Sequence, residues 1–167
     1  GGNGRSKVDF LFSRNINNID QAKKLTFSIR KIFNDPNYPI LIDQEGGRVN
    51  RLKKIISFDN LTAEFFGKKF SKNYLEFKIF FKLFIDKTSF LLKSIGVNIN
   101  TMPVLDLKIK GSSNVIGDRS YSNDPKIVSK IGDICIDFFR QNSIGTVIKH
   151  IPGHGLAKVD SHHYTPI

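Results

Sequence analysis

Residues 38–48 read Tyr38-Pro39-Ile40-Leu41-Ile42-Asp43-Gln44-Glu45-Gly46-Gly47-Arg48. The first five residues form an apolar run of the length that is typical of a buried strand. The run ends in acidic and amide side chains, and the adjacent Gly46 and Gly47 permit a tight backbone path there. This stretch therefore predicts a strand whose carboxyl end carries side chains capable of chemistry.

The same arrangement of an apolar run followed by polar residues recurs along the chain. Further strands are predicted at residues 8–12, 97–101 and 145–148, and each leads into polar residues. Helices are predicted at residues 18–33, at residues 61–94 with a break near 71–73, and at residues 124–139. The residues that should end or begin these helices are Asn34, Gly96, Asp124 and Pro125.

Strands that alternate with helices imply parallel pairing through helical crossovers, which is an α/β fold. Sites on such folds lie at the carboxyl ends of the strands, where this chain places its polar residues. A complete (β/α)8 TIM barrel needs about 250 residues, whereas about four parallel strands occupy all 167 residues here. We therefore expect half of a barrel in one unit at residues 8–167, and we assign no role to residues 1–7, an N-terminal scar or incomplete first segment.

The chain carries a net charge of +11, which would suit a polyanionic partner if the charges formed a patch. The lysines of residues 68–93 instead stand singly among apolar residues, a layout typical of solvated helix faces. We predict no nucleic-acid partner, and no membrane partner because no apolar run approaches the length of a span. Cys135 is the only cysteine and stands between two isoleucines, which excludes an intrachain disulfide and predicts a buried thiol.

All four histidines lie near the carboxyl end of the chain, at His150, His154, His162 and His163. Clustered histidines after a strand suggest proton transfer, and Asp160 is close enough to His162 to orient its imidazole. Two other readings stay open: Asp160 and His162 could cap turns in a polar loop, or the cluster could bind a metal. The segment 150–154 contains a proline and a glycine, so it is not a helical zinc motif.

Asp43 and Glu45 could be the paired carboxylates of a glycosidase, although Arg48 and Arg51 could equally neutralise them. Arginine and aspartate at strand ends also suit hydroxyl-rich ligands, because both make directional hydrogen bonds to sugar oxygens. No nucleophile elbow surrounds Ser13, Thr101 or Ser161, and no phosphate-binding fingerprint is present.

Five segments carry polar residues at the ends of the predicted strands or in the loops that follow. They are Leu11-Phe12-Ser13-Arg14-Asn15, Ile42-Asp43-Gln44-Glu45-Gly46-Gly47-Arg48-Val49, Met102-Pro103-Val104-Leu105-Asp106, Ile116-Gly117-Asp118-Arg119-Ser120-Tyr121, and Lys149-His150-Ile151-Pro152-Gly153-His154-Gly155 followed by Asp160-Ser161-His162. Together, in order and spacing, these segments resemble the β-N-acetylhexosaminidases of glycoside hydrolase family 3.

The resemblance implies the N-terminal half of a (β/α)8 TIM barrel. It implies a pocket for a non-reducing N-acetylglucosamine lined by Asp43, Arg51, Arg119, Lys149 and His150, and an acid/base dyad of Asp160 and His162. Glu45 would support the pocket and His154 would shape the loop, while Asp106 and His163 receive no role. Local alternatives are an ion pair from Arg119 to Asp118 or Asp124, and a helix cap at Asp43.

The implied activity is hydrolysis of terminal β-linked N-acetylglucosamine, from muropeptide fragments in cell-wall recycling in the bacterial cytoplasm, without metal or cofactor. A retaining mechanism would need a carboxylate nucleophile, expected after Ile167, so residues 1–167 alone should be inactive. One alternative is phosphorolysis, since a histidine acid/base tolerates an incoming phosphate that a carboxylate would repel. A more distant alternative is a basic module that binds polyanions.

Overall fold

The computed structural model describes residues 8–111 and 114–155, and it confirms the predicted parallel α/β fold. Four strands form one sheet in the order β1 (Asp9–Leu11), β2 (Ile40–Ile42), β3 (Ile99–Asn100) and β4 (Gly145–Thr146). All three pairings are parallel, with Asp9 opposite Ile40, Leu41 opposite Ile99, and Ile99 opposite Gly145. The described chain thus has the four-stranded arrangement expected of half a barrel.

The strands β3 and β4 are shorter than their apolar runs because the ladder between them is interrupted. Pro103 has no N–H to donate to a neighbouring strand. Pairing resumes beyond it, where Val104 and Lys149 form a parallel bridge and Leu105 N donates to Lys149 O at 2.6 Å. The segment after β4 is therefore held against the segment after β3, with Lys149 at the point of contact.

The helix α1 (Ile19–Phe33) ends where the sequence predicts. The side chain of Asn18 accepts a hydrogen bond from Gln21 N at the first turn, and Asn34 takes the left-handed conformation with φ of 51°. A short 3-10 turn, η1 (Ser13–Asn15), connects β1 to this helix.

The long helical region divides at Asn73, as expected, into α2 (Ala63–Lys72) and α3 (Tyr74–Ser94). The Asn73 backbone N–H donates to Lys69 O, and its side chain accepts from Glu76 N. One residue therefore ends one helix and starts the next. Gly96 then leaves α3 with φ of +77°, a conformation that glycine adopts without steric cost. None of the described helices is both long and apolar enough to cross a membrane.

The helix α4 (Pro125–Gln141) follows the turn η2 (Gly117–Arg119) and starts at the predicted cap, because Asp124 accepts from Lys126 N at 2.8 Å. Its apolar stripe faces the core, and Cys135 on that stripe is fully buried and free, as predicted. Burial raises the pKa of the Cys135 thiol well above its ordinary value, so this cysteine is a packing residue.

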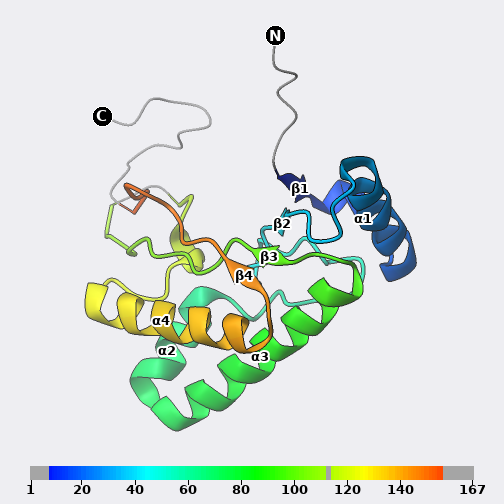
Figure 1. Cartoon of the computed structure of the whole chain (residues 1–167). Helices are drawn as coiled ribbons and strands as arrows, with labels where there is room; N and C mark the ends of the chain where they lie inside the picture. Colours follow the sequence, from blue (N-terminus) through cyan, green and yellow to red (C-terminus); the bar gives the residue numbers. More distant parts are fainter. Residues whose placement is uncertain (1–7, 112–113, 156–167) are drawn as a thin grey trace.

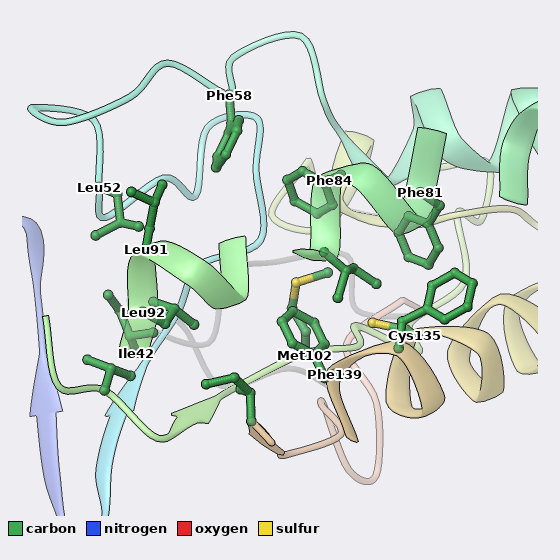
Figure 2. Close-up of a cluster of buried hydrophobic side chains, with 14 of the residues drawn as sticks. Ile42, Leu52, Phe58, Phe81, Phe84, Leu91, Leu92, Met102, Cys135 and Phe139 are labelled. Carbon is green, nitrogen blue, oxygen red and sulfur yellow. The ribbon is translucent and has the colours of Figure 1, made fainter. Parts of the chain in front are cut away.

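The core lies between the sheet and the helices α2, α3 and α4, while α1 lies beside β1 (Figure 1). Aromatic rings dominate it: Phe66 and Phe81 have centroids 4.7 Å apart, and Phe77 stacks on Phe81 at 5.1 Å. Figure 2 shows Phe81 and Phe84 of α3 facing the buried Met102 beyond β3 and the side chains of α4. This packing fixes the carboxyl ends of the strands, where the functional residues lie.

Candidate active site

Three polar side chains meet where β2, β3 and β4 end. Asp43 directly follows β2, Thr101 follows β3, and Lys149 lies three residues beyond β4. Lys149 Nζ lies 2.9 Å from Asp43 Oδ1 and 3.0 Å from Thr101 Oγ1, and the Thr101 hydroxyl donates to the same Asp43 oxygen. Residues more than a hundred positions apart in sequence are thereby joined in one hydrogen-bonded group.

Glu45 is buried and belongs to the same hydrogen-bonded group. Arg119 donates to it through Nε and Nη2, both at 2.8 Å, and Lys149 Nζ lies 2.5 Å from Glu45 Oε1. Two-point arginine–carboxylate contact fixes orientation as well as charge. The local ion pairs considered for Arg119 are wrong, because Asp118 pairs with Arg48 at 3.1 Å and Asp124 caps α4.

The loop that carries Asp43 and Glu45 is held by buried amides. Asn100 Oδ1 accepts from Gln44 N at 3.0 Å while Asn100 Nδ2 donates to Gln44 O at 3.0 Å, so one side chain satisfies both backbone groups. Gly46 has φ of +87°, and a Cβ there would lie 2.2 Å from the Leu61 carbonyl oxygen. The predicted tight path at the paired glycines is therefore confirmed, with a backbone contact as its reason.

Arg48 and Arg51 have different tasks. Arg51 Nη2 lies 3.3 Å from Asp43 Oδ2, so one arginine does neutralise a carboxylate of the loop. Arg48 contacts neither Asp43 nor Glu45 in the described structure; its Nη2 instead donates to three successive carbonyls at residues 114–116. It secures the loop that leads into Arg119.

His150 is held by Asp106, a residue to which sequence reasoning gave no role. His150 Nδ1 lies 2.5 Å from Asp106 Oδ2, and the His150 backbone N–H donates to the same oxygen at 3.1 Å. The other oxygen, Oδ1, accepts the backbone N–H of His154. A signal for Asp106 was present, since it is the first polar side chain after the apolar run 102–105, as Asp43 is after β2.

Most of these side chains, though not Arg48 or Asp106, line a concave pocket of about 510 Å³, a size suited to a small ligand. All five predicted binding residues meet there. Asp160 and His162, the predicted dyad, and His163 lie outside the described residues. Within residues 8–111 and 114–155, no three His, Cys, Asp or Glu side chains group as a metal site. The pocket is lined by Phe10, Phe12, Asp43, Glu45, Val49, Arg51, Thr101, Arg119, Val147, Lys149 and His150.

The protein-family model described as the glycosyl hydrolase family 3 N-terminal domain matches residues 8–167 of this chain. The chain belongs to glycosyl hydrolase family 3. The resemblance seen in the sequence motifs is thereby confirmed, together with the α/β architecture that it implied.

Relatives of this family 3 chain are hexosaminidases by name. A β-hexosaminidase of Hydrogenovibrio crunogenus is 37% identical over 91% of this chain and 42% of its own length. The crystal structure of NagZ from Neisseria gonorrhoeae in complex with N-trifluoroacetyl-D-glucosamine superposes with a TM-score of 0.83 at 29% identity, covering 94% of this chain and 46% of that one. A family 3 β-N-acetylglucosaminidase from Paenibacillus sp. gives a TM-score of 0.79 at 29% identity, covering 95% and 30%. The chain thus spans less than half the length of each.

The carboxylates of this family 3 site stay ionised near neutral pH. Burial would raise the pKa of Asp43, but the Thr101 hydrogen bond and the charge of Lys149 outweigh it and lower the pKa to about 2. Burial likewise opposes ionisation of Glu45, and the hydrogen bond from Arg119 with the charge of Lys149 lowers its pKa. Neither group holds a proton at pH 7, so neither suits the role of general acid.

Asp43 should make the stability of the protein depend on acidity. The pKa of Asp43 in the folded protein is about 2, below the ordinary 3.8. Asp43 therefore adds about 2 kcal/mol to the free energy of unfolding. This contribution is fully present well above pH 4 and is lost as the pH falls through 2. We expect Asp43→Asn to lower the free energy of unfolding at pH 7 and to flatten its decline between pH 5 and pH 2. Urea unfolding over this range measures both, and an unchanged slope in the variant would contradict the assignment.

Proposed function

We propose that this domain is part of a β-N-acetylhexosaminidase, which removes β-linked N-acetylglucosamine from the non-reducing end of its substrate. In this proposal the domain binds that terminal sugar. The observation that carries the proposal is the convergence of Asp43, Arg51, Arg119, Lys149 and His150 on one pocket at the carboxyl ends of the strands. Sites of α/β barrels lie on this edge of the sheet. The presence of a glucosamine derivative in the similar NagZ structure supports the sugar class.

The pocket chemistry suits a polyhydroxylated ligand. Each sugar hydroxyl both donates and accepts a hydrogen bond, so a site that recognises several of them needs acceptors and donors side by side. Asp43 supplies ionised acceptor oxygens, and Lys149 and Arg51 supply cationic donors within 3.3 Å of it. Each of these cations already pairs with a carboxylate, so it can donate a hydrogen bond to a neutral sugar hydroxyl without needing an anionic ligand.

We propose that Asp160 and His162 perform the proton transfers, with Asp160 orienting the imidazole and His162 acting as acid and then as base. A retaining mechanism also needs a carboxylate nucleophile. Asp43 and Glu45 are committed to ion pairs with Lys149 and the arginines, so we place the nucleophile in the part of the relatives that this chain does not cover. No metal or organic cofactor takes part in this scheme.

We further propose muropeptide fragments from cell-wall recycling as substrates and the bacterial cytoplasm as the location. Phosphorolysis is the second candidate, favoured by the histidine acid/base, which does not repel an incoming phosphate. In that case phosphate would be required and the product would be a sugar 1-phosphate. A basic polyanion-binding module is a distant third, and it would show salt-sensitive binding that survives loss of His162.

The test is release of 4-nitrophenol from 4-nitrophenyl β-N-acetylglucosaminide by the protein made from the complete reading frame. His162→Ala should lower kcat/KM by at least about 10²-fold, because general acid–base catalysis contributes that much or more. His163→Ala, one position along, is the matched control and should retain activity, while residues 1–167 alone should be inactive. Inertness of the complete protein with and without phosphate would refute the assignment.

A further inference from the structure

The carboxylate of Asp106 holds two separate parts of the site with its two oxygens. Its side chain is completely buried, at the end of the segment that follows β3. Oδ2 accepts from the His150 backbone at 3.1 Å and contacts His150 Nδ1 at 2.5 Å, while Oδ1 accepts from the His154 backbone. One buried anion thus fixes both the ring of a pocket residue and the segment that follows it.

The contact with Asp106 determines which ring nitrogen of His150 carries hydrogen. An ionised carboxylate only accepts hydrogen bonds, so Nδ1 must be the donor. Asp106 is ionised near neutral pH: burial opposes this, but the hydrogen bonds from His150 and His154 lower its pKa. In the neutral ring Nε2 is therefore a bare acceptor, and His150 lines the pocket.

We propose that Asp106 is a positioning residue for sugar binding, which keeps His150 in the Nδ1–H form so that Nε2 accepts a hydrogen bond from a substrate hydroxyl. The same carboxylate anchors the backbone at His154, eight residues before His162. The sugar contact rests on the proposed function, whereas the ring state of His150 does not. Asp106 itself lines no part of the pocket and acts through His150.

The charged groups around His150 are of both signs. We therefore attribute the position of the ring hydrogen to the specific contact with Asp106. The His154 ring lies 6.0 Å from the His150 ring, centroid to centroid. The charged groups that share the pocket or the segment with His150 are Asp43, Glu45 and Arg51 after β2, Asp106 after β3, Arg119 of η2, and Lys149.

The ring state is measured directly by long-range 1H–15N spectra of the histidine side chains in the complete protein without ligand, with His150→Gln used to assign the signals. We expect the neutral His150 ring to carry hydrogen on Nδ1 in the wild type. In Asp106→Asn, whose amide has the same shape but can donate, the Nε2–H form should gain population. A wild-type ring with hydrogen on Nε2 would overturn the proposal without any variant being needed.

Kinetics then test the link to the sugar. Asp106→Asn should lower kcat/KM on order of 10²-fold, mainly through KM, which is less than the loss of about 10⁴-fold for a triad aspartate because His150 binds rather than transfers a proton. In a protein that already carries His150→Gln, Asp106→Asn should cause little further loss of kcat/KM. If the role of Asp106 were purely structural, Asp106→Asn would lower kcat/KM equally with and without His150. If the complete protein is inert but the Nδ1–H state and its dependence on Asp106 hold, the proposed function fails and the positioning of the ring stands.

Discussion

Replacing Glu45 with glutamine should lower the free energy of unfolding by about 3–5 kcal/mol, the usual cost of breaking a buried ion pair from one side. The substitution keeps the shape and removes one charge. Arg119 and Lys149, whose side chains are only 15% and 13% exposed, would then share Asp43 as the nearest anion. The cost comes from leaving two buried cations with one carboxylate between them, because Arg119 loses the charge that accepts both of its hydrogen bonds. We expect the proposed sugar hydrolysis to fall as well, since Arg119 and Lys149 line the pocket.

The control for Glu45→Gln is an arginine–carboxylate pair of the same chemistry on the surface. Arg140 lies 2.8 Å from Asp137, with the side chains 78% and 54% exposed. Asp137→Asn should change the stability by less than about 0.5 kcal/mol, because water and salt screen an exposed pair. Urea unfolding of the complete protein measures the free energy of unfolding of both variants, from the shift of the midpoint at an unchanged m-value. Equal losses of stability in the two variants would show that burial does not determine how much the ion pairs of Glu45 contribute.

The features that the sequence predicted well are those set by neighbours in the chain. Asn73 ends α2 and begins α3 because its own backbone and side chain satisfy both helix ends. Gly96 leaves α3 with φ of +77°, a conformation that glycine adopts without steric cost. Helix stripes, caps and tight turns depend on residues three or four positions apart, so one sequence is enough to locate them.

The partners of the site residues were harder to predict because they are set by the sheet. Arg119 pairs with Glu45, 74 positions away, although acidic residues stand much nearer in the chain. Lys149 reaches Asp43 across 106 positions. Only the parallel order of the strands brings these residues to one edge of the sheet. Patterns in a single sequence predict that the residues lie at this edge, but they do not predict which side chains contact each other there.

The role of Asp106 is hard to predict for a different reason. Its function depends on the path of the segment after β4, which places two backbone N–H groups and an imidazole around one carboxylate. The rule that identified Asp43, a polar residue at the end of an apolar run, applies to it equally. Applied to every strand, that rule selects the residues that hold the site as well as those that line it.

The second large effect is expected from Gly67→Ala in α2, which should destabilise the protein by about 3 kcal/mol through overpacking. A Cβ at Gly67 would lie 1.7 Å from the carbonyl oxygen of Tyr121 and 2.7 Å from its carbonyl carbon. Both atoms are backbone, so no rotamer change relieves the clash. α2 must move away from the segment that follows Arg119, and the higher helix propensity of alanine, about 1 kcal/mol, offsets only part of the cost.

Gly132→Ala in α4 separates this clash from any general effect of adding a methyl group to a buried helical glycine. Its Cβ would lie 2.8 Å from Leu105 Cδ2 and 3.7 Å from Pro103 Cγ, and the end of a leucine side chain is free to shift. The gain in helix propensity should then keep Gly132→Ala within about 1 kcal/mol of the wild type. Thermal and urea unfolding of the complete protein compare the two. A Gly67→Ala variant as stable as Gly132→Ala would mean that α2 is not packed directly on the Tyr121 backbone, and the position of Arg119 would lose its support from that side.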